Sequence, residues 1–349
     1  MRKWILRIHL VLGILLGIYV TLIGVTGSVL VYREEFAARA RPDLFVPVDA
    51  IRSSPDEAAA SIAKAFPGWK MLSLEGPDAL NGTWTSYLIG KGPAKVVFVD
   101  ASTGAMRGHY EPGEWWVGKM DSLHGNLMSG RNGRVVNGYC AIGCVLLTAT
   151  GLLLWRPPLS RLRWRALNVH VNLGLVAALF LFLTGITGAY FTWHQPYVDV
   201  AHWLLPSRKV EPLPPVVVSG DRKSLAEMLE TAKRVAPGTR LLRVPQSRKP
   251  TEPVDFTMRH GRDFEFQLVS HVVINPYTGE IMRLDQLEDR LAGDRLVGQY
   301  SSVHNGVWGG ELSRALWCVL GLTLPVLFGT SFVLWWRKLR QRGLVGLWG

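Results

Sequence analysis

The chain has 349 residues, 48% of them hydrophobic, and a formal net charge of +12. Its positive mean hydropathy excludes a single ordinary water-soluble domain. The positive charge does not indicate nucleic-acid binding, because eleven basic residues lie in three short segments beside apolar runs, with no acidic residue among them. The remaining charges nearly cancel, so we expect no nucleic-acid partner.

Four apolar runs are long enough to cross a bilayer, which takes about 20 residues of helix. Two long polar stretches, a short basic link and a basic tail separate or follow them. Because basic residues favour the cytoplasmic side, we expect both termini and the link in the cytoplasm. Both polar stretches then lie outside, in the periplasm if this is the inner membrane of a Gram-negative cell. In chain order the predicted segments are the span 5–32, the polar stretch 33–131, the span 135–155, the link 156–169, the span 170–193, the polar stretch 195–310, the span 315–336 and the tail 337–349.

Each polar stretch predicts a small α+β domain, with one helix against a short antiparallel sheet. In the first, a capping sequence at Ser54 begins a helix that Pro67 ends. Runs rich in β-branched and aromatic residues then predict strands, followed by turn sequences DASTG and NPYTG. The predicted strands cover 83–89 and 95–99 in the first stretch and 253–259 and 264–274 in the second, whose helix covers 222–235.

The sequence repeats itself. Residues 9–32 and 170–193 both begin with a histidine and agree at three further glycines and one threonine. The segments SLHGN at 122–126 and SVHNG at 302–306 precede the second and fourth spans. Both copies run helix, outer domain, helix, so we expect a membrane α-helical bundle of four transmembrane helices with pseudo-two-fold symmetry about the membrane normal.

Two histidines occupy the same depth in the repeated span. A histidine on a lipid-embedded helix is costly unless it is satisfied, and both His9 and His170 fall near the cytoplasmic side of the bilayer. Gly13 and Gly174, one helical turn later, leave space beside them. A bis-histidine haem b needs two neutral imidazoles on opposite sides of a flat macrocycle, so we predict His9 and His170 as ligands of one haem iron. Hydrogen-bonded helix-end histidines are the alternative.

A second histidine pair lies toward the other side of the membrane. His124 and His304 precede Trp155 and Trp335 by 31 residues, more than a bilayer thickness of helix. We place them on external loops or helix extensions and predict them as ligands of a second haem iron. His194 and His202, which follow the third span, are alternative external ligands, and loop histidines bonded to neighbouring side chains are the other reading.

These motifs resemble a known family. The helix–strand–strand unit with its D/N-x-x-TG turn resembles the PepSY domain. The LHG segment, the GLLLW end of the second span and the H-x3-G…TGxTG helices resemble the PepSY-associated transmembrane family. That family includes iron-regulated inner-membrane proteins and ferrisiderophore reductases. The resemblance implies a haem-containing membrane protein that passes electrons to exported ferric siderophores.

We therefore expect a haem-dependent oxidoreductase that reduces a periplasmic ferric siderophore docked between two PepSY-like domains. The chain carries no GxGxxG or P-loop sequence, so electrons must come from membrane quinol or a separate cytoplasmic reductase. Two other functions stay open. The first is that of a non-catalytic membrane protein whose outer domains bind or regulate a periplasmic partner. A metal or haem transporter is less favoured, because the spans carry almost no acidic residues to line a path.

Overall fold

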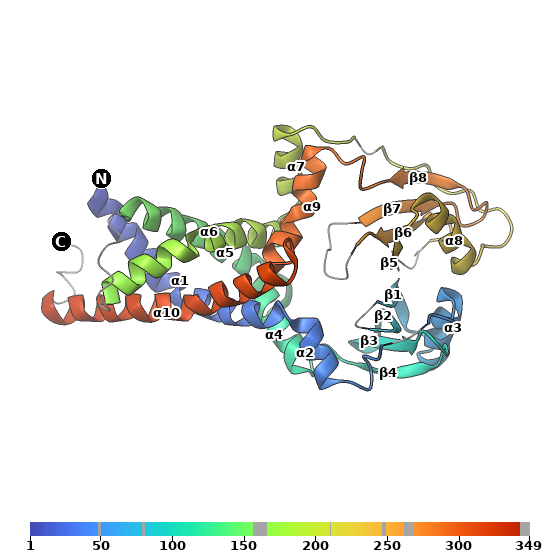
Figure 1. Cartoon of the computed structure of the whole chain (residues 1–349), viewed down its shortest axis with the longest axis horizontal. Helices are drawn as coiled ribbons and strands as arrows, with labels where there is room; N and C mark the ends of the chain where they lie inside the picture. Colours follow the sequence, from blue (N-terminus) through green and yellow to red (C-terminus); the bar gives the residue numbers. More distant parts are fainter. Residues whose placement is uncertain are drawn as a thin grey trace. The chain divides into compact units, whose positions relative to one another are not determined.

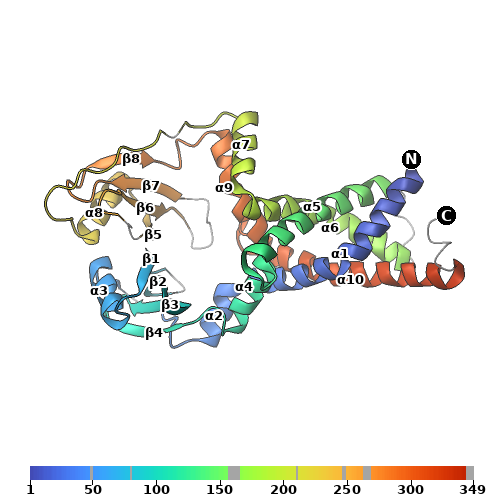
Figure 2. The same ribbon diagram turned by 180° about the vertical axis from the view of Figure 1, so that it is seen from behind.

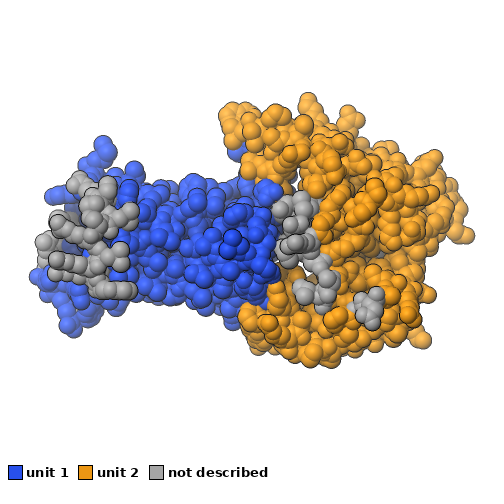
Figure 3. All heavy atoms as spheres, viewed as in Figure 1, with its two compact units in different colours: residues 1–32, 120–200, 299–349 blue, residues 33–119, 201–298 orange. Residues whose placement is uncertain are grey.

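The protein divides into two compact units, seen in different colours in Figure 3. The bundle unit comprises residues 1–32, 120–200 and 299–349, and the sheet unit comprises 33–119 and 201–298. The computed structural model describes residues 1–47, 50–78, 81–155, 166–209, 211–245, 249–261 and 269–342. Most of the predicted basic link and the end of the basic tail lie outside these residues.

Four long helices form the bundle unit (Figures 1 and 2), and each is long and apolar enough to cross a membrane. Both α1 and α6 pack against α5 and against α10. Consequently α1 and α6 occupy opposite corners of the bundle. The four predicted membrane helices are confirmed, each beginning a few residues before its apolar run. Their bounds are α1 Arg2–Leu30, α5 Gly130–Leu154, α6 Ala166–Thr192 and α10 Gly310–Arg342.

Glycines let the helices of the bundle approach closely. A Cβ added at Gly24 of α1 would lie 2.7 Å from the carbonyl oxygen of Gly321 in α10. At the aligned position of the repeat, a Cβ on Gly185 would lie 3.1 Å from the carbonyl oxygen of Ala141 in α5. Both glycines therefore serve close helix packing, which is the main source of helix association in lipid.

Four shorter helices flank the spans, and two of them replace segments that we expected as loops or helix extensions. Helix α4 carries the SLHGN sequence and α9 carries SVHNG. Leu127 and Met128 follow α4 with φ of 51° and 56°, and Gly306 follows α9 with φ of 71°. These left-handed residues end each helix and turn the chain into the next span. The bounds are α2 Arg33–Ala40, α4 Trp116–Asn126, α7 His194–Leu204 and α9 Ala292–Asn305.

One eight-stranded antiparallel sheet forms the sheet unit, where we expected two separate sheets. Its order is β4-β3-β2-β1-β5-β6-β7-β8, so the two halves meet where β1 pairs with β5. Pairing these strands satisfies the N–H and C=O groups that two separate edges would expose. The first part of the predicted strand 264–274 lies outside the described residues. The strands are β1 Lys70–Glu75, β2 Thr83–Gly90, β3 Gly92–Asp100, β4 Met106–Tyr110, β5 Arg240–Pro245, β6 Val254–Arg259, β7 Val269–Ile274 and β8 Ile281–Asp285.

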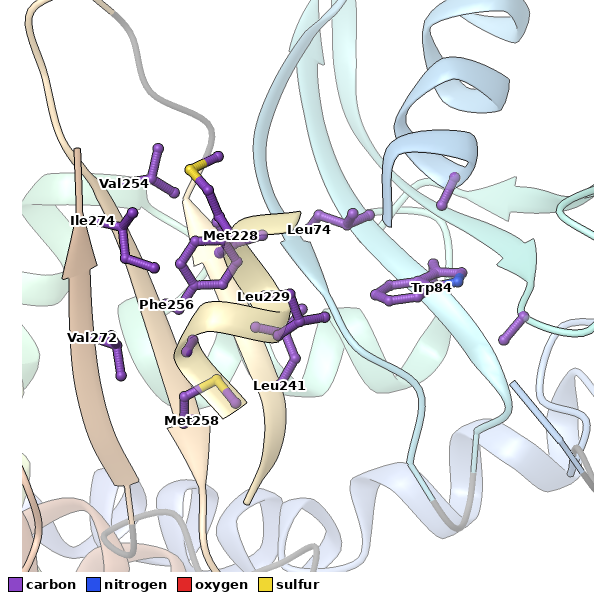
Figure 4. Packing of buried hydrophobic residues seen from close by; sticks show 14 of the residues in the cluster. Leu74, Trp84, Met228, Leu229, Leu241, Val254, Phe256, Met258, Val272 and Ile274 are labelled. Atoms are coloured by element: carbon purple, nitrogen blue, oxygen red, sulfur yellow. The ribbon is translucent and has the colours of Figure 1, made fainter. Parts of the chain in front are cut away.

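Two helices, α3 (Pro55–Ala65) and α8 (Leu225–Val235), cover one face of the sheet and pack against each other. The carboxylate of Asp56 in α3 accepts hydrogen bonds from the first two backbone N–H groups of α8, at 2.8 and 2.7 Å. Such a carboxylate satisfies donors that have no partner within the helix. Residues from both halves, such as Leu74 and Phe256, share one hydrophobic core (Figure 4).

The two turn sequences use the same local geometry with different charge. Asp100 Oδ1 accepts hydrogen bonds from the backbone N–H groups of Ser102 and Thr103, while Gly104 takes a φ of 72°. Asn275 Oδ1 does the same in the second turn. Only the charged Asp100 also binds a guanidinium, with Arg107 Nη2 at 2.6 Å.

The Asp100 carboxylate predicts a pH-dependent stability of the sheet unit. Burial raises its pKa, but hydrogen bonds from Ser102 and Arg107 outweigh burial and hold the pKa well below its usual range. The ionised form therefore stabilises the fold fully above the unfolded pKa of about 3.9, and this contribution disappears as the pH falls toward the folded pKa. We expect Asp100→Asn to lower the free energy of unfolding by about 1–3 kcal/mol at pH 7, and by less below pH 4.

Unfolding of the detergent-solubilised protein, followed by circular dichroism between pH 7 and pH 3, measures this difference. Asp43→Asn is the matched control, because Asp43 pairs with Arg41 in an exposed position where an ion pair contributes little. Equal effects of the two substitutions at pH 7 would contradict the assignment.

Candidate functional site

The first histidine pair comes from the two diagonal helices of the bundle. His9 lies on α1 and His170 on α6, and their ring centroids are 6.3 Å apart with planes at 74°. Because α1 and α6 stand at opposite corners, these side chains meet in the interior between the helices. The structure thus brings together the two residues that the repeat predicted as partners.

Each ring of the first pair is anchored through Nδ1. His9 Nδ1 lies 3.2 Å from the carbonyl oxygen of Leu147 in α5, and His170 Nδ1 lies 3.2 Å from that of Leu327 in α10. A carbonyl oxygen can only accept, so Nδ1 carries the proton in both residues. In the neutral imidazole Nε2 then keeps its lone pair, and this is the form of histidine that binds a metal ion.

The second histidine pair has the same arrangement. His124 on α4 and His304 on α9 have ring centroids 5.9 Å apart and planes at 63°. His124 Nδ1 lies 3.1 Å from the hydroxyl of Thr26 in α1, and His304 Nδ1 lies 3.0 Å from the hydroxyl of Thr187 in α6. The structure places this predicted pair together as well.

The threonines of the second pair fix its tautomers. Thr26 donates its hydroxyl hydrogen to the carbonyl oxygen of Leu22 at 2.8 Å, and Thr187 donates to that of Leu183 at 2.7 Å. Each hydroxyl can then only accept from the imidazole, so Nδ1 is protonated and Nε2 is free. Burial lowers the pKa of His124, and burial together with the neighbouring His124 lowers the pKa of His304 to about 3. Both imidazoles are neutral at pH 7.

The spacing within each pair fits one metal ion between two imidazoles. Imidazole nitrogens bind transition metals at about 2 Å, and each ring centroid lies about 1 Å behind its nitrogen, which sums to centroids about 6 Å apart. Among the described residues no group of three or more His, Cys, Asp or Glu could hold a metal ion by itself. Two protein ligands on opposite sides suit a metal whose other positions a macrocycle fills, as in haem.

Glycines adapt the helices to the rings. A Cβ at Gly27 would lie 2.9 Å from Cε1 of His124, and one at Gly151 would lie 3.1 Å from Cε1 of His9. A Cβ at Gly13, one turn from His9, would meet nothing within 4 Å. The missing side chain of Gly27 therefore makes room for the imidazole of His124. At Gly13 the space stays open, as a macrocycle beside His9 would require.

The two pairs lie at opposite ends of the spans. Thr26, the partner of His124, follows His9 by 17 residues on the same helix, which is about 26 Å of axial rise. The hydrocarbon core of a bilayer is about 30 Å thick. The arrangement therefore provides one facing histidine pair near each end of the membrane-spanning helices.

The remaining histidines have other partners. The ring of His194 contacts that of Tyr190, with centroids 4.8 Å apart and planes tilted by 56°, and His202 Nε2 lies 3.3 Å from the carboxylate of Asp294. The described contacts therefore do not place either of the two alternative ligands in the second pair. The other three histidines contact side chains of the sheet unit: His109 meets Phe66, His260 meets Ser270 and His271 meets Asp255.

Sequence reasoning missed the oxygens that anchor the rings. Thr150 and Thr330 contribute hydroxyls 3.1 and 3.2 Å from Nδ1 of His9 and His170. Thr26 and Thr187 are the one threonine on which the two repeated segments agree, but the repeat alone did not identify them as partners of the histidines. All four threonines recur at matching positions of the repeat, so recurrence of a polar residue in a span was the signal for them.

Two comparisons with known proteins bear on this site. The sequence model for the family described as the PepSY-associated TM region matches residues 6–338, which include all four paired histidines. No curated protein matches the sequence.

The glycine beside His124 leaves less room for a methyl group than the glycine beside His304, and this difference tests how closely α1 packs against the His124 ring. Gly27→Ala puts a methyl group against His124 at 2.9 Å, whereas at Gly188 it meets His304 at an ordinary 3.5 Å. We expect Gly27→Ala to destabilise the bundle by about 1–3 kcal/mol through overpacking, and Gly188→Ala to change it far less. Thermal unfolding in detergent compares the two. The interpretation is wrong if Gly188→Ala is the more damaging substitution.

Proposed function

Because this chain belongs to the PepSY-associated transmembrane family, we propose that it is a haem-containing membrane oxidoreductase that carries electrons across the bilayer to a ferric siderophore. The observation that supports this most strongly is the presence of two facing histidine pairs, one near each end of the same four-helix bundle. A single pair would serve a buried metal site, whereas two suit a path from one face to the other.

The proposed role of the four histidines is to ligate iron through Nε2. The Nδ1 hydrogen bonds to helix oxygens hold each ring in one orientation and raise the basicity of the free nitrogen. Haem bound in such a site supplies a one-electron carrier, whose potential depends on its axial ligands and surroundings. The hydrogen bonds to the bundle helices keep the rings of both pairs in place.

The direction of transfer follows from the basic residues. Arg2, Lys3 and Arg7 lie at the beginning of α1, which supports the proposal that this end and the first histidine pair lie on the cytoplasmic side of the inner membrane. Quinol or a separate cytoplasmic reductase would supply electrons there. The second pair and the two polar stretches would then lie on the periplasmic side, where the acceptor binds.

The proposed acceptor is a ferric siderophore in the periplasm. Adding one electron converts its Fe(III) to Fe(II), which such chelators hold weakly, so the metal is released. The two halves form one sheet through the pairing of β1 with β5. An acceptor docked between the halves would therefore lie on this joined sheet unit, where residues of both halves, among them Ser54 and Lys233, line a pocket.

Absorption spectroscopy of the purified protein tests the cofactor. We expect a b-type reduced-minus-oxidised spectrum, with about half of the haem lost from His9→Ala/His170→Ala and about half from His124→Ala/His304→Ala. His194→Ala and His202→Ala are matched controls, because the contacts of those residues lie elsewhere, and they keep the full spectrum. A colourless, folded parent protein would favour the non-catalytic or transporter functions instead.

Electron transfer itself is tested in proteoliposomes. With a quinol as donor and a ferric hydroxamate siderophore on the side of the sheet unit, we expect Fe(II) to appear in a ferrous-specific chelator. Replacing either histidine pair should slow this at least tenfold. Unchanged reduction by both double variants would show that the electrons take another route.

A further inference from the structure

The two halves of the bundle differ at one pair of equivalent positions. Aligning His9 with His170 places Tyr19 opposite Phe180, and aligning His124 with His304 places Asn137 opposite Trp317. In each half the two residues contact each other, across α1 and α5 in the first and across α6 and α10 in the second. One contact is polar and the other is aromatic.

In the first half, the polar contact continues to a histidine of the second pair. Tyr19 donates its hydroxyl hydrogen to Asn137 Oδ1 at 2.6 Å. Asn137 Nδ2 donates to the carbonyl oxygen of His124 at 2.7 Å and lies 3.3 Å from that of Gly125. These carbonyls belong to the last turn of α4, where no intrahelical donor remains. Because Tyr19 occupies Oδ1, the Asn137 amide can present only its NH2 group to α4.

In the second half, no such hydrogen bond reaches His304 from the equivalent residues. Phe180 and Trp317 pack edge to face with centroids 5.5 Å apart, and Trp308 contacts Trp317 at 5.6 Å. Trp317 is 7% exposed, and within the described part of the chain its buried indole N–H has no hydrogen-bond partner. Apolar packing alone therefore fills the place that Tyr19 and Asn137 take in the first half.

We propose that Asn137, oriented by Tyr19, is a positioning residue for His124 and makes the two ligands of the second histidine pair inequivalent. The proposal rests on the proposed function, because it concerns ligands of a haem. Phe180 and Trp317 show that this place in the fold can be filled without polar groups. Inside membrane helices an amide and a phenol cost more free energy than two aromatic side chains. Their hydrogen bonds end on the backbone of a proposed haem ligand.

Asn137 and Thr26 contact different parts of His124. Thr26 holds the imidazole through Nδ1, and Asn137 holds the backbone of the same residue. Together they fix both ends of the side chain. Of these two restraints, His304 has only the hydrogen bond between its ring and Thr187. We therefore expect the ring of His124 to have a narrower range of orientations than the ring of His304.

Low-temperature electron paramagnetic resonance and haem release to apomyoglobin test this with the full-length, haem-loaded protein. We expect Asn137→Ala to shift the low-spin ferric signal of the second pair and to speed release of its haem about tenfold. Tyr19→Phe, which leaves the amide in place but frees its orientation, should change both in the same direction by about threefold. The signal and content of the first pair's haem report that each variant is folded.

Trp317→Phe and Phe180→Leu are the matched controls, and both should leave release within about twofold of the parent. Equal shifts from Asn137→Ala and Trp317→Phe, or no shift from Asn137→Ala and Tyr19→Phe with both haems bound, would overturn the positioning role and leave the proposed function intact. A parent protein that binds no haem would overturn both.

Discussion

Each paired histidine donates a hydrogen bond from Nδ1–H to an oxygen of a neighbouring helix, and the rest of the site depends on this bond. An unsatisfied imidazole would be costly among apolar helices, so the oxygens of Leu147 and Leu327 and the hydroxyls of Thr26 and Thr187 decide where each ring can lie. In the neutral imidazoles these bonds leave Nε2 free. The diagonal placement of α1 and α6 brings His9 and His170 together at one end of the bundle. At the other end, Thr26 of α1 and Thr187 of α6 anchor His124 of α4 and His304 of α9.

The duplicated sequence retains what both halves need and varies the rest. The histidines and their threonine partners recur, and the order of elements from α1 to α5 is the order from α6 to α10. The two halves differ at positions where only one of them has a charged or polar residue. Asp100 binds Arg107, while the neutral Asn275 leaves Arg283 to pair with Asp285. Tyr19 and Asn137, opposite two aromatic residues, are the corresponding case inside the bundle.

The sequence predicted the spans and the histidine pairs because both depend on local signals, an apolar run of sufficient length and a residue repeated at one depth. It did not predict the joined sheet. The pairing of Leu74 with Val244 connects strands that are far apart in the chain, and neither strand alternates clearly enough to show a partner. His124 and His304 were expected on loops or helix extensions because 31 residues of helix exceed the thickness of a bilayer. In the structure the separate helices α4 and α9 carry them and end at Asn126 and Asn305.

We propose that the two histidine pairs hold two haems, one near each membrane face. This is tested by the ratio of haem to protein in the detergent-purified chain, from the pyridine haemochrome assay, together with the spin state of the ferric form. We expect two b-type haems per chain, both six-coordinate and low-spin. A folded chain with no haem, or with haem that is high-spin and five-coordinate, would contradict it.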